Sequence, residues 1–74
     1  MLTAGIVIRT LPGRAGEVEH QLAVIPEMRI QSRADDRVTG VCTIPSGRTL
    51  AAFLDRVRAQ SPGIATIETT FVSE

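Results

Sequence analysis

The sequence predicts one small α+β domain whose strands and helices follow the order β-α-β-β-α-β. Four segments have the apolar or alternating pattern of strands, and two have apolar residues at helical spacing. Pro or Gly residues separate most of these segments. A length of 74 residues suits a single domain over residues 1–74, and 43% hydrophobic residues are enough for a core.

The first strand and the first helix are predicted from the opening third of the chain. Thr3 to Leu11 is rich in Ile and Val and nearly continuously apolar, which is typical of a central strand. After a Pro-Gly break, a helix is expected from Arg14 to Ile25, and Pro26 ends it because the residue before a proline disfavours helical geometry. The apolar residues of this helix recur at helical spacing: Ala15, Val18, Leu22 and Ile25.

A hairpin and a second helix are predicted next. Met28 to Arg33 alternates between apolar and polar residues, and Val38 to Ile44 is the following strand, so the two form an antiparallel hairpin. Ser46 is the expected N-cap of the second helix. The apolar face of that helix contains Leu50, Phe53, Leu54 and Val57.

The last strand, Ile64 to Val72, completes the predicted sheet. Its alternation places Ile67 and Phe71 on one side and Glu68 on the other. This order of elements predicts a four-stranded antiparallel sheet with both helices on one face, the ferredoxin-like sandwich.

One face of this sheet is predicted to stay uncovered, because no sequence remains to cover it. Alternation assigns to the helix side Ile6, Ile8, Val38, Cys42, Ile44, Ile67 and Phe71. It assigns to the open side Val7, Arg9, Thr39, Val41, Thr43, Thr66, Glu68 and Thr70. Such a broad, mildly apolar surface is typical of an interaction site, and peptides bind sheets either on a face or by adding a strand at an edge. We therefore predict that these eight open-side residues form an interaction site, and a bound peptide is one occupant that suits it.

Composition and spacing argue against several function classes. Basic and acidic residues balance at eight each, and aromatics are only 3%, which disfavours nucleic-acid binding. His20 and Cys42 stand alone in their segments, so no metal site, cofactor site or nucleophile–base pair is expected. Cys42 is expected in the core and His20 in solvent, and Asp35 is expected to form a turn together with Asp36. The sequence therefore predicts a binding protein and not an enzyme.

The ends and the cysteine content suggest where such a protein works. The opening residues lack the charged start and apolar run of a signal peptide, and no apolar stretch is long enough to span a bilayer. A single cysteine allows no internal disulfide. We expect a cytoplasmic protein without stable membrane insertion, present as a monomer or weak dimer.

The chain resembles the NapD family over nearly its whole length. The resemblance includes the opening strand from Ala4 to Arg9 and the helix end, proline and strand from Leu22 to Ile30. It also includes Thr49 and Leu50 at the start of the second helix, the segment from Pro62 to Ile67, and the pair Phe71 and Val72.

This resemblance implies a specific task. NapD proteins are cytoplasmic chaperones that bind the twin-arginine signal peptide of the catalytic subunit of periplasmic nitrate reductase. They delay its export until the molybdenum cofactor is inserted, and they carry no cofactor themselves. On this basis Val7 and Val41 would contact the apolar part of the signal peptide, and Glu68 would pair with an arginine. Arg9 would repel the arginine pair unless Glu68 neutralises it.

Two other functions remain open from the sequence alone. A ferredoxin-like domain of this size also suits a small-molecule sensor that binds ligands of the amino-acid type. It suits equally an assembly subunit whose open sheet face forms a homodimer. A small hydrolase would require a catalytic site that the sequence does not contain.

Overall fold

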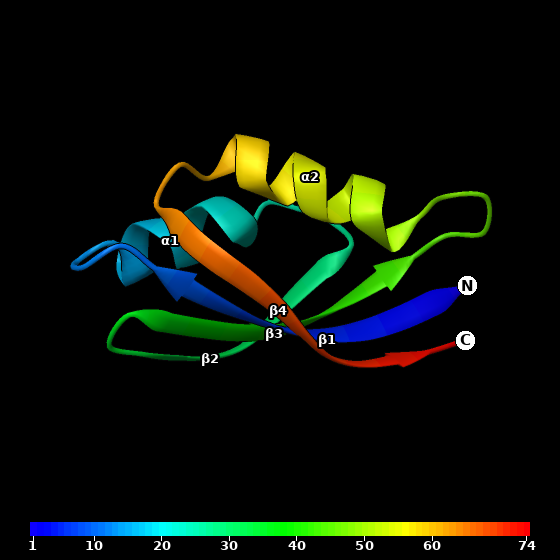
Figure 1. Cartoon of the computed structure of the whole chain (residues 1–74), viewed down its shortest axis with the longest axis horizontal. Helices are drawn as coiled ribbons and strands as arrows, with labels where there is room; N and C mark the ends of the chain where they lie inside the picture. Colours follow the sequence, from blue (N-terminus) through cyan, green and yellow to red (C-terminus); the bar gives the residue numbers. More distant parts are fainter.

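The computed structural model describes all 74 residues and confirms the predicted order of elements. The chain forms β1 (Leu2–Thr10), α1 (Ala15–Leu22), β2 (Met28–Ala34), β3 (Arg37–Ile44), α2 (Leu50–Gln60) and β4 (Ile64–Ser73). The four strands pair antiparallel in the order β2-β3-β1-β4, and both helices lie on one side of the sheet (Figure 1). This is a ferredoxin-like α+β fold.

The core lies between the helices and the covered face of the sheet. Ile6 and Ile8 of β1 are each 1% exposed, and Val38 and Cys42 of β3 are fully buried. The helices contribute the buried residues Ala15, Val18, Leu22, Phe53 and Val57. Burial of these apolar side chains is the main source of stability in a chain this small.

Cys42 and His20 lie where the sequence predicts. The Cys42 thiol is buried in the core, where its Sγ donates to the backbone carbonyl of Ala4 at 3.5 Å. Burial raises the pKa of this thiol, which keeps it in the unreactive protonated form. His20 is exposed near the end of α1.

Two helix boundaries differ from the sequence predictions. The structure ends α1 at Leu22, and Ile25 lies in a turn in which its N–H donates to the Leu22 carbonyl at 3.0 Å. Thr49, and not Ser46, is the N-cap of α2, because its Oγ1 accepts a hydrogen bond from the Ala52 N–H at 3.1 Å. The chain turns at Gly47, whose φ of 87° requires glycine, so the helix begins three residues later than Ser46 suggests.

Phe71 lies on the open face, so its predicted place on the helix side is wrong. Ile6 pairs with Thr69, but the preceding Gly5 pairs with Phe71, so Thr70 is an extra residue in a β-bulge. The bulge reverses the alternation of β4 and turns the Phe71 ring away from the helices. The ring lies over Gly5, where a methyl group would overlap it.

Neither helix is long and apolar enough to cross a bilayer; the longer one, α2, has 11 residues.

Candidate functional site: the open face of the sheet

The register of the sheet brings the predicted binding residues onto one face. Residues directly opposite each other in antiparallel strands project to the same side. Three successive rows run across β3, β1 and β4: Arg37, Arg9 and Thr66; then Thr39, Val7 and Glu68; then Val41, Gly5 and Phe71. Thr43 lies one row further, opposite Thr3, and the Thr70 hydroxyl lies over Gly5 at the bulge.

The centre of this face is apolar. Val7 and Val41 are half-buried although no other element covers them. Phe71 is 48% exposed beside them, in the same row as Val41. Valine methyls and an aromatic ring surrounded by threonine hydroxyls form a surface that can contact an apolar partner and hydrogen-bond at its rim.

Phe71 is the residue of this face that the sequence analysis missed. Alternation alone gives no sign of a bulge in β4. The available signal was Gly5, because a glycine in the middle of a central strand leaves a gap that an aromatic side chain from the neighbouring strand can fill. In the structure Gly5 is buried beneath Phe71 and Thr70.

The charges on this face are unevenly distributed. Arg9 lies directly opposite Arg37, and neither forms an ion pair. Glu68 is also unpaired, so it does not neutralise Arg9. Asp35 and Asp36 lie at the tip of the β2–β3 hairpin and border a hollow of about 280 Å³ with the two arginines. Two arginines and two aspartates therefore meet at the hairpin end of the face, and Arg9 and Arg37 have no ion-pair partner there.

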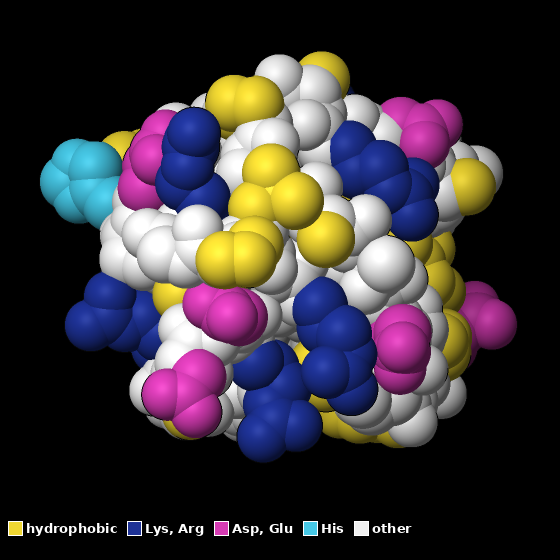
Figure 2. Space-filling view, turned by 60° about the vertical axis from the view of Figure 1, so that its left-hand side comes forward, with side chains coloured by type: hydrophobic (Ala, Val, Ile, Leu, Met, Phe, Trp, Pro, Cys, Tyr) yellow, Lys and Arg dark blue, Asp and Glu magenta, His cyan; other side chains and the backbone are white.

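The hairpin end of the molecule shows no surface of one sign. In Figure 2 the basic and acidic side chains are interspersed with hydrophobic ones. This pattern matches the net charge of zero and does not resemble the basic stripe of a nucleic-acid-binding protein.

The β2 side of the open face is hollowed. Val41 and Thr43 line a hollow of about 490 Å³ together with Pro26, Met28 and Arg29 at the start of β2, and with Glu27. A peptide lying across the sheet would therefore meet an apolar centre and a concave margin.

Both edges of the sheet are interrupted. The outer strand β2 has an irregularity between Ile30 and Ser32, and β4 has two, next to Thr70 and near Ala65. Such bulges break the run of hydrogen-bonding groups that an added strand needs. The geometry therefore favours the open face over the edges for binding a peptide.

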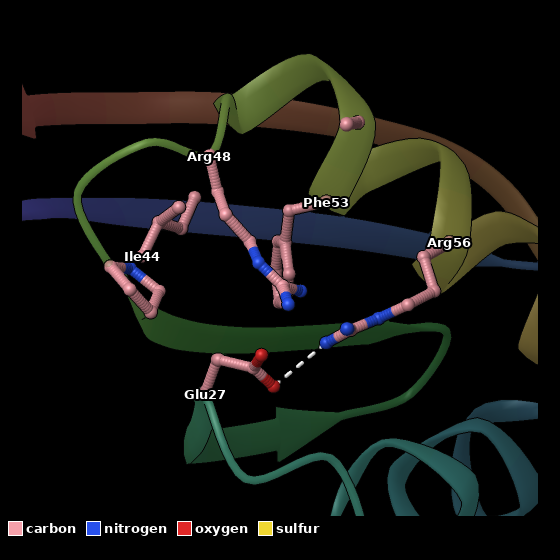
Figure 3. Close-up of a pocket in the computed structure, with 7 residues that line it drawn as sticks. Glu27, Ile44, Arg48, Phe53 and Arg56 are labelled. Atoms are coloured by element: carbon pink, nitrogen blue, oxygen red, sulfur yellow. Dashed lines mark hydrogen bonds and ion pairs between the residues drawn. The ribbon is translucent and has the colours of Figure 1, made fainter.

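A second concave site lies at the end of the molecule where α2 begins. Glu27 precedes β2, and its carboxylate Oε1 lies 2.7 Å from Nη2 of Arg56 in α2. Arg48 projects toward the same carboxylate (Figure 3). A hydrogen bond from its own backbone N–H and the neighbouring Arg56 hold the pKa of Glu27 below its ordinary value. This site could not be predicted from the sequence, because its charged residues are far apart along the chain.

The chain was compared with protein-family models, curated proteins and solved structures, and none of them matched.

Proposed function

We propose that this protein is a non-enzymatic cytoplasmic chaperone of the NapD type. Its proposed partner is the twin-arginine signal peptide of the periplasmic nitrate reductase precursor, bound on the open sheet face. The observation that carries this proposal is the uncovered apolar centre of Val7, Val41 and Phe71. The choice of partner rests on the sequence resemblance.

The chemistry of a twin-arginine signal peptide suits this face. Its apolar segment would lie over the valines and the Phe71 ring and bury apolar area on both sides. Its arginine pair would lie over β4 beside Glu68, which has no arginine partner within the chain. Arg9 and Arg37 would repel the arginine pair, so the peptide would bind with its basic end away from their row.

Titration of the labelled protein with a synthetic twin-arginine peptide tests the proposed surface. We expect saturable amide shifts centred on Val7, Val41 and Phe71, with the exposed side of α1 unmoved. Val41→Glu places a charge against the apolar segment and is expected to weaken binding more than about tenfold. Ala51→Glu adds the same charge on the exposed surface of α2 and serves as the control. Equal binding by the two variants would contradict the assigned surface.

Charge substitutions test the orientation of the peptide. Glu68→Gln should weaken binding about tenfold, because it removes a charge-assisted hydrogen bond to the arginine pair. Arg9→Gln should strengthen binding, because it removes a repulsion. A peptide with two glutamines in place of its arginines should lose both responses. If Glu68→Gln and Arg9→Gln leave the affinity unchanged, the arginine pair does not lie on this face.

Gel filtration separates this function from a homodimer formed through the same face. A protein that elutes as a dimer, and that Val41→Glu converts to a monomer, would show that a second copy occupies the surface. If the face binds a peptide and not a second copy, the native protein and Val41→Glu should elute at the same volume.

A further inference from the structure

A compact cleft lies on the opposite side of the sheet from the proposed peptide surface, between the start of α2 and the connection into β2. Its volume is about 240 Å³. The cleft is lined by Glu27, Ile44, Pro45, Arg48, Ala52, Phe53 and Arg56. Segments from three parts of the chain therefore meet around one small cavity.

Of the three charged side chains in the cleft, Arg56 and Glu27 form an ion pair with each other. The guanidinium of Arg56 donates to Glu27 at 2.7 Å and lies 5.3 Å from the centre of the Phe53 ring. This ion pair and cation–π contact hold both side chains in place. Glu27 is only 20% exposed at its side chain, so its carboxylate is partly shielded from water.

Arg48 is the third charged group, and it faces the Glu27 carboxylate from beyond ion-pair distance. It forms no ion pair within 4 Å, and it projects toward the cavity from the residue before the N-cap of α2 (Figure 3). The first turn of α2 contains no acidic residue, so the positive end of the helix dipole is also uncompensated there. One carboxylate and two guanidiniums leave the cleft with one net positive charge beside an apolar wall.

We infer that this cleft binds a small organic monocarboxylate with a compact apolar body. The planar guanidinium of Arg48 matches the two oxygens of a carboxylate. The apolar body would lie against the exposed Pro45 and Ala52, because Ile44 and Phe53 are almost fully buried. A single negative charge balances the cleft, whereas a phosphate dianion would leave excess negative charge near Glu27. The volume is below the roughly 300–1,000 Å³ of pockets for drug-sized ligands, so the ligand is about as large as one amino-acid side chain.

Phenylacetate is a suitable probe, with phenylacetamide as its neutral match and inorganic phosphate as the anion without an apolar body. In amide-shift titrations we expect phenylacetate to give saturable shifts at Arg48, Ala52 and Phe53. Phenylacetamide and phosphate should each bind at least tenfold more weakly. Val7 and Phe71 of the open face line neither the cleft nor the hollow that contains Glu27, so they should not move, and the outcome is independent of the proposed peptide binding.

Two matched variants decide whether Arg48 recognises the carboxylate. Arg48→Gln should weaken phenylacetate binding at least tenfold and leave the melting temperature unchanged, since this side chain forms no ion pair. Arg58→Gln removes the same charge from the exposed side of α2, where Arg58 pairs with Asp55, and should leave binding unchanged. Absence of saturable shifts, equal affinities for phosphate and phenylacetate, or unchanged binding by Arg48→Gln would each overturn the inference.

Discussion

The two faces of the sheet are built from alternate residues of the same strands and differ in what they contribute. Ile8 of β1 is 1% exposed beneath the helices, whereas its neighbour Val7 is half-buried on a face that no element covers. Charges differ in the same way: near the helices Glu27 is paired with Arg56, but on the open face Glu68 and Arg9 are unpaired. This contrast indicates that the covered face determines stability and that the open face contributes less to it.

The largest expected difference between the faces is in how much the free energy of unfolding falls when a side chain is truncated. Ile8→Ala should lower the free energy of unfolding by about 2–5 kcal/mol, because it leaves a cavity in a close-packed core. Urea unfolding followed by circular dichroism measures this change. In a protein of this size such a loss can remove most of the stability.

The matched substitution on the open face is Val7→Ala. It should cost less than about 1 kcal/mol, because Val7 already contacts water and no cavity forms. A similar cost for both substitutions would contradict the contrast, since it would mean that the open face is also packed.

A smaller effect is expected at the contact between Gly5 and Phe71. A methyl group at Gly5 would overlap the Phe71 ring and the Thr70 hydroxyl, so both side chains must move. Gly5→Ala should therefore destabilise the fold by about 1–3 kcal/mol, and it should weaken peptide binding because the ring leaves the apolar centre.

A double-mutant cycle checks the cause of this effect. In the Phe71→Ala background the ring is absent, so Gly5→Ala should cost clearly less than in the native protein. An unchanged cost would show that the Phe71 ring does not restrict Gly5.

The helix–sheet arrangement follows from local sequence patterns, which explains why it was predictable. β1 and β3 pair with each other without a bulge, so the alternation of their side chains continues along the whole pairing. Both faces of these two strands are therefore predicted correctly. In β4 the bulge at Thr70 shifts the pairing by one residue, and Phe71 moves to the other face. A period of two cannot reveal such an insertion, because both registers fit the same sequence.

The cleft beside α2 was not predictable for a different reason. Arg56 and Glu27 are 29 positions apart in the sequence, and only the packing of α2 against the end of the hairpin brings them together. The N-cap of α2 could not be predicted either, because the choice between two capping residues depends on the shape of the preceding turn. Ser46 and Thr49 are both good capping residues, and the turn at Gly47 selects the second.

Lowering the pH should reduce the contribution of the paired charges in the cleft to the free energy of unfolding. It should not change the contribution of the unpaired charges on the open face. In the folded state the backbone hydrogen bond of Glu27 and its hydrogen bond with Arg56 lower the pKa of this carboxyl, so its ionised form stabilises the protein above the ordinary pKa of about 4.5. This contribution is lost as the pH falls through the lowered value. Glu27→Gln should be less stable than the native protein at pH 7, and the difference should shrink toward pH 3.

Glu68→Gln is the control for this pH dependence. Glu68 has no ion-pair partner, so its replacement should leave the urea midpoint almost unchanged at both pH values. A difference between Glu27→Gln and the native protein that stays constant with pH would show that packing, and not charge, is lost at Glu27.

The smallest effect on stability is expected from Val7→Thr, which replaces one methyl with a hydroxyl on the open face and keeps the β-branched shape. The hydroxyl can reach water, so the free energy of unfolding should change by less than about 0.5 kcal/mol. The same substitution removes apolar area from the peptide surface and should weaken binding of the twin-arginine peptide about threefold to fivefold. Unfolding and peptide titration on one sample measure both quantities. A loss of stability with unchanged affinity would reverse the roles assigned to the two faces, because Val7 would then act as a core residue and not as a binding residue.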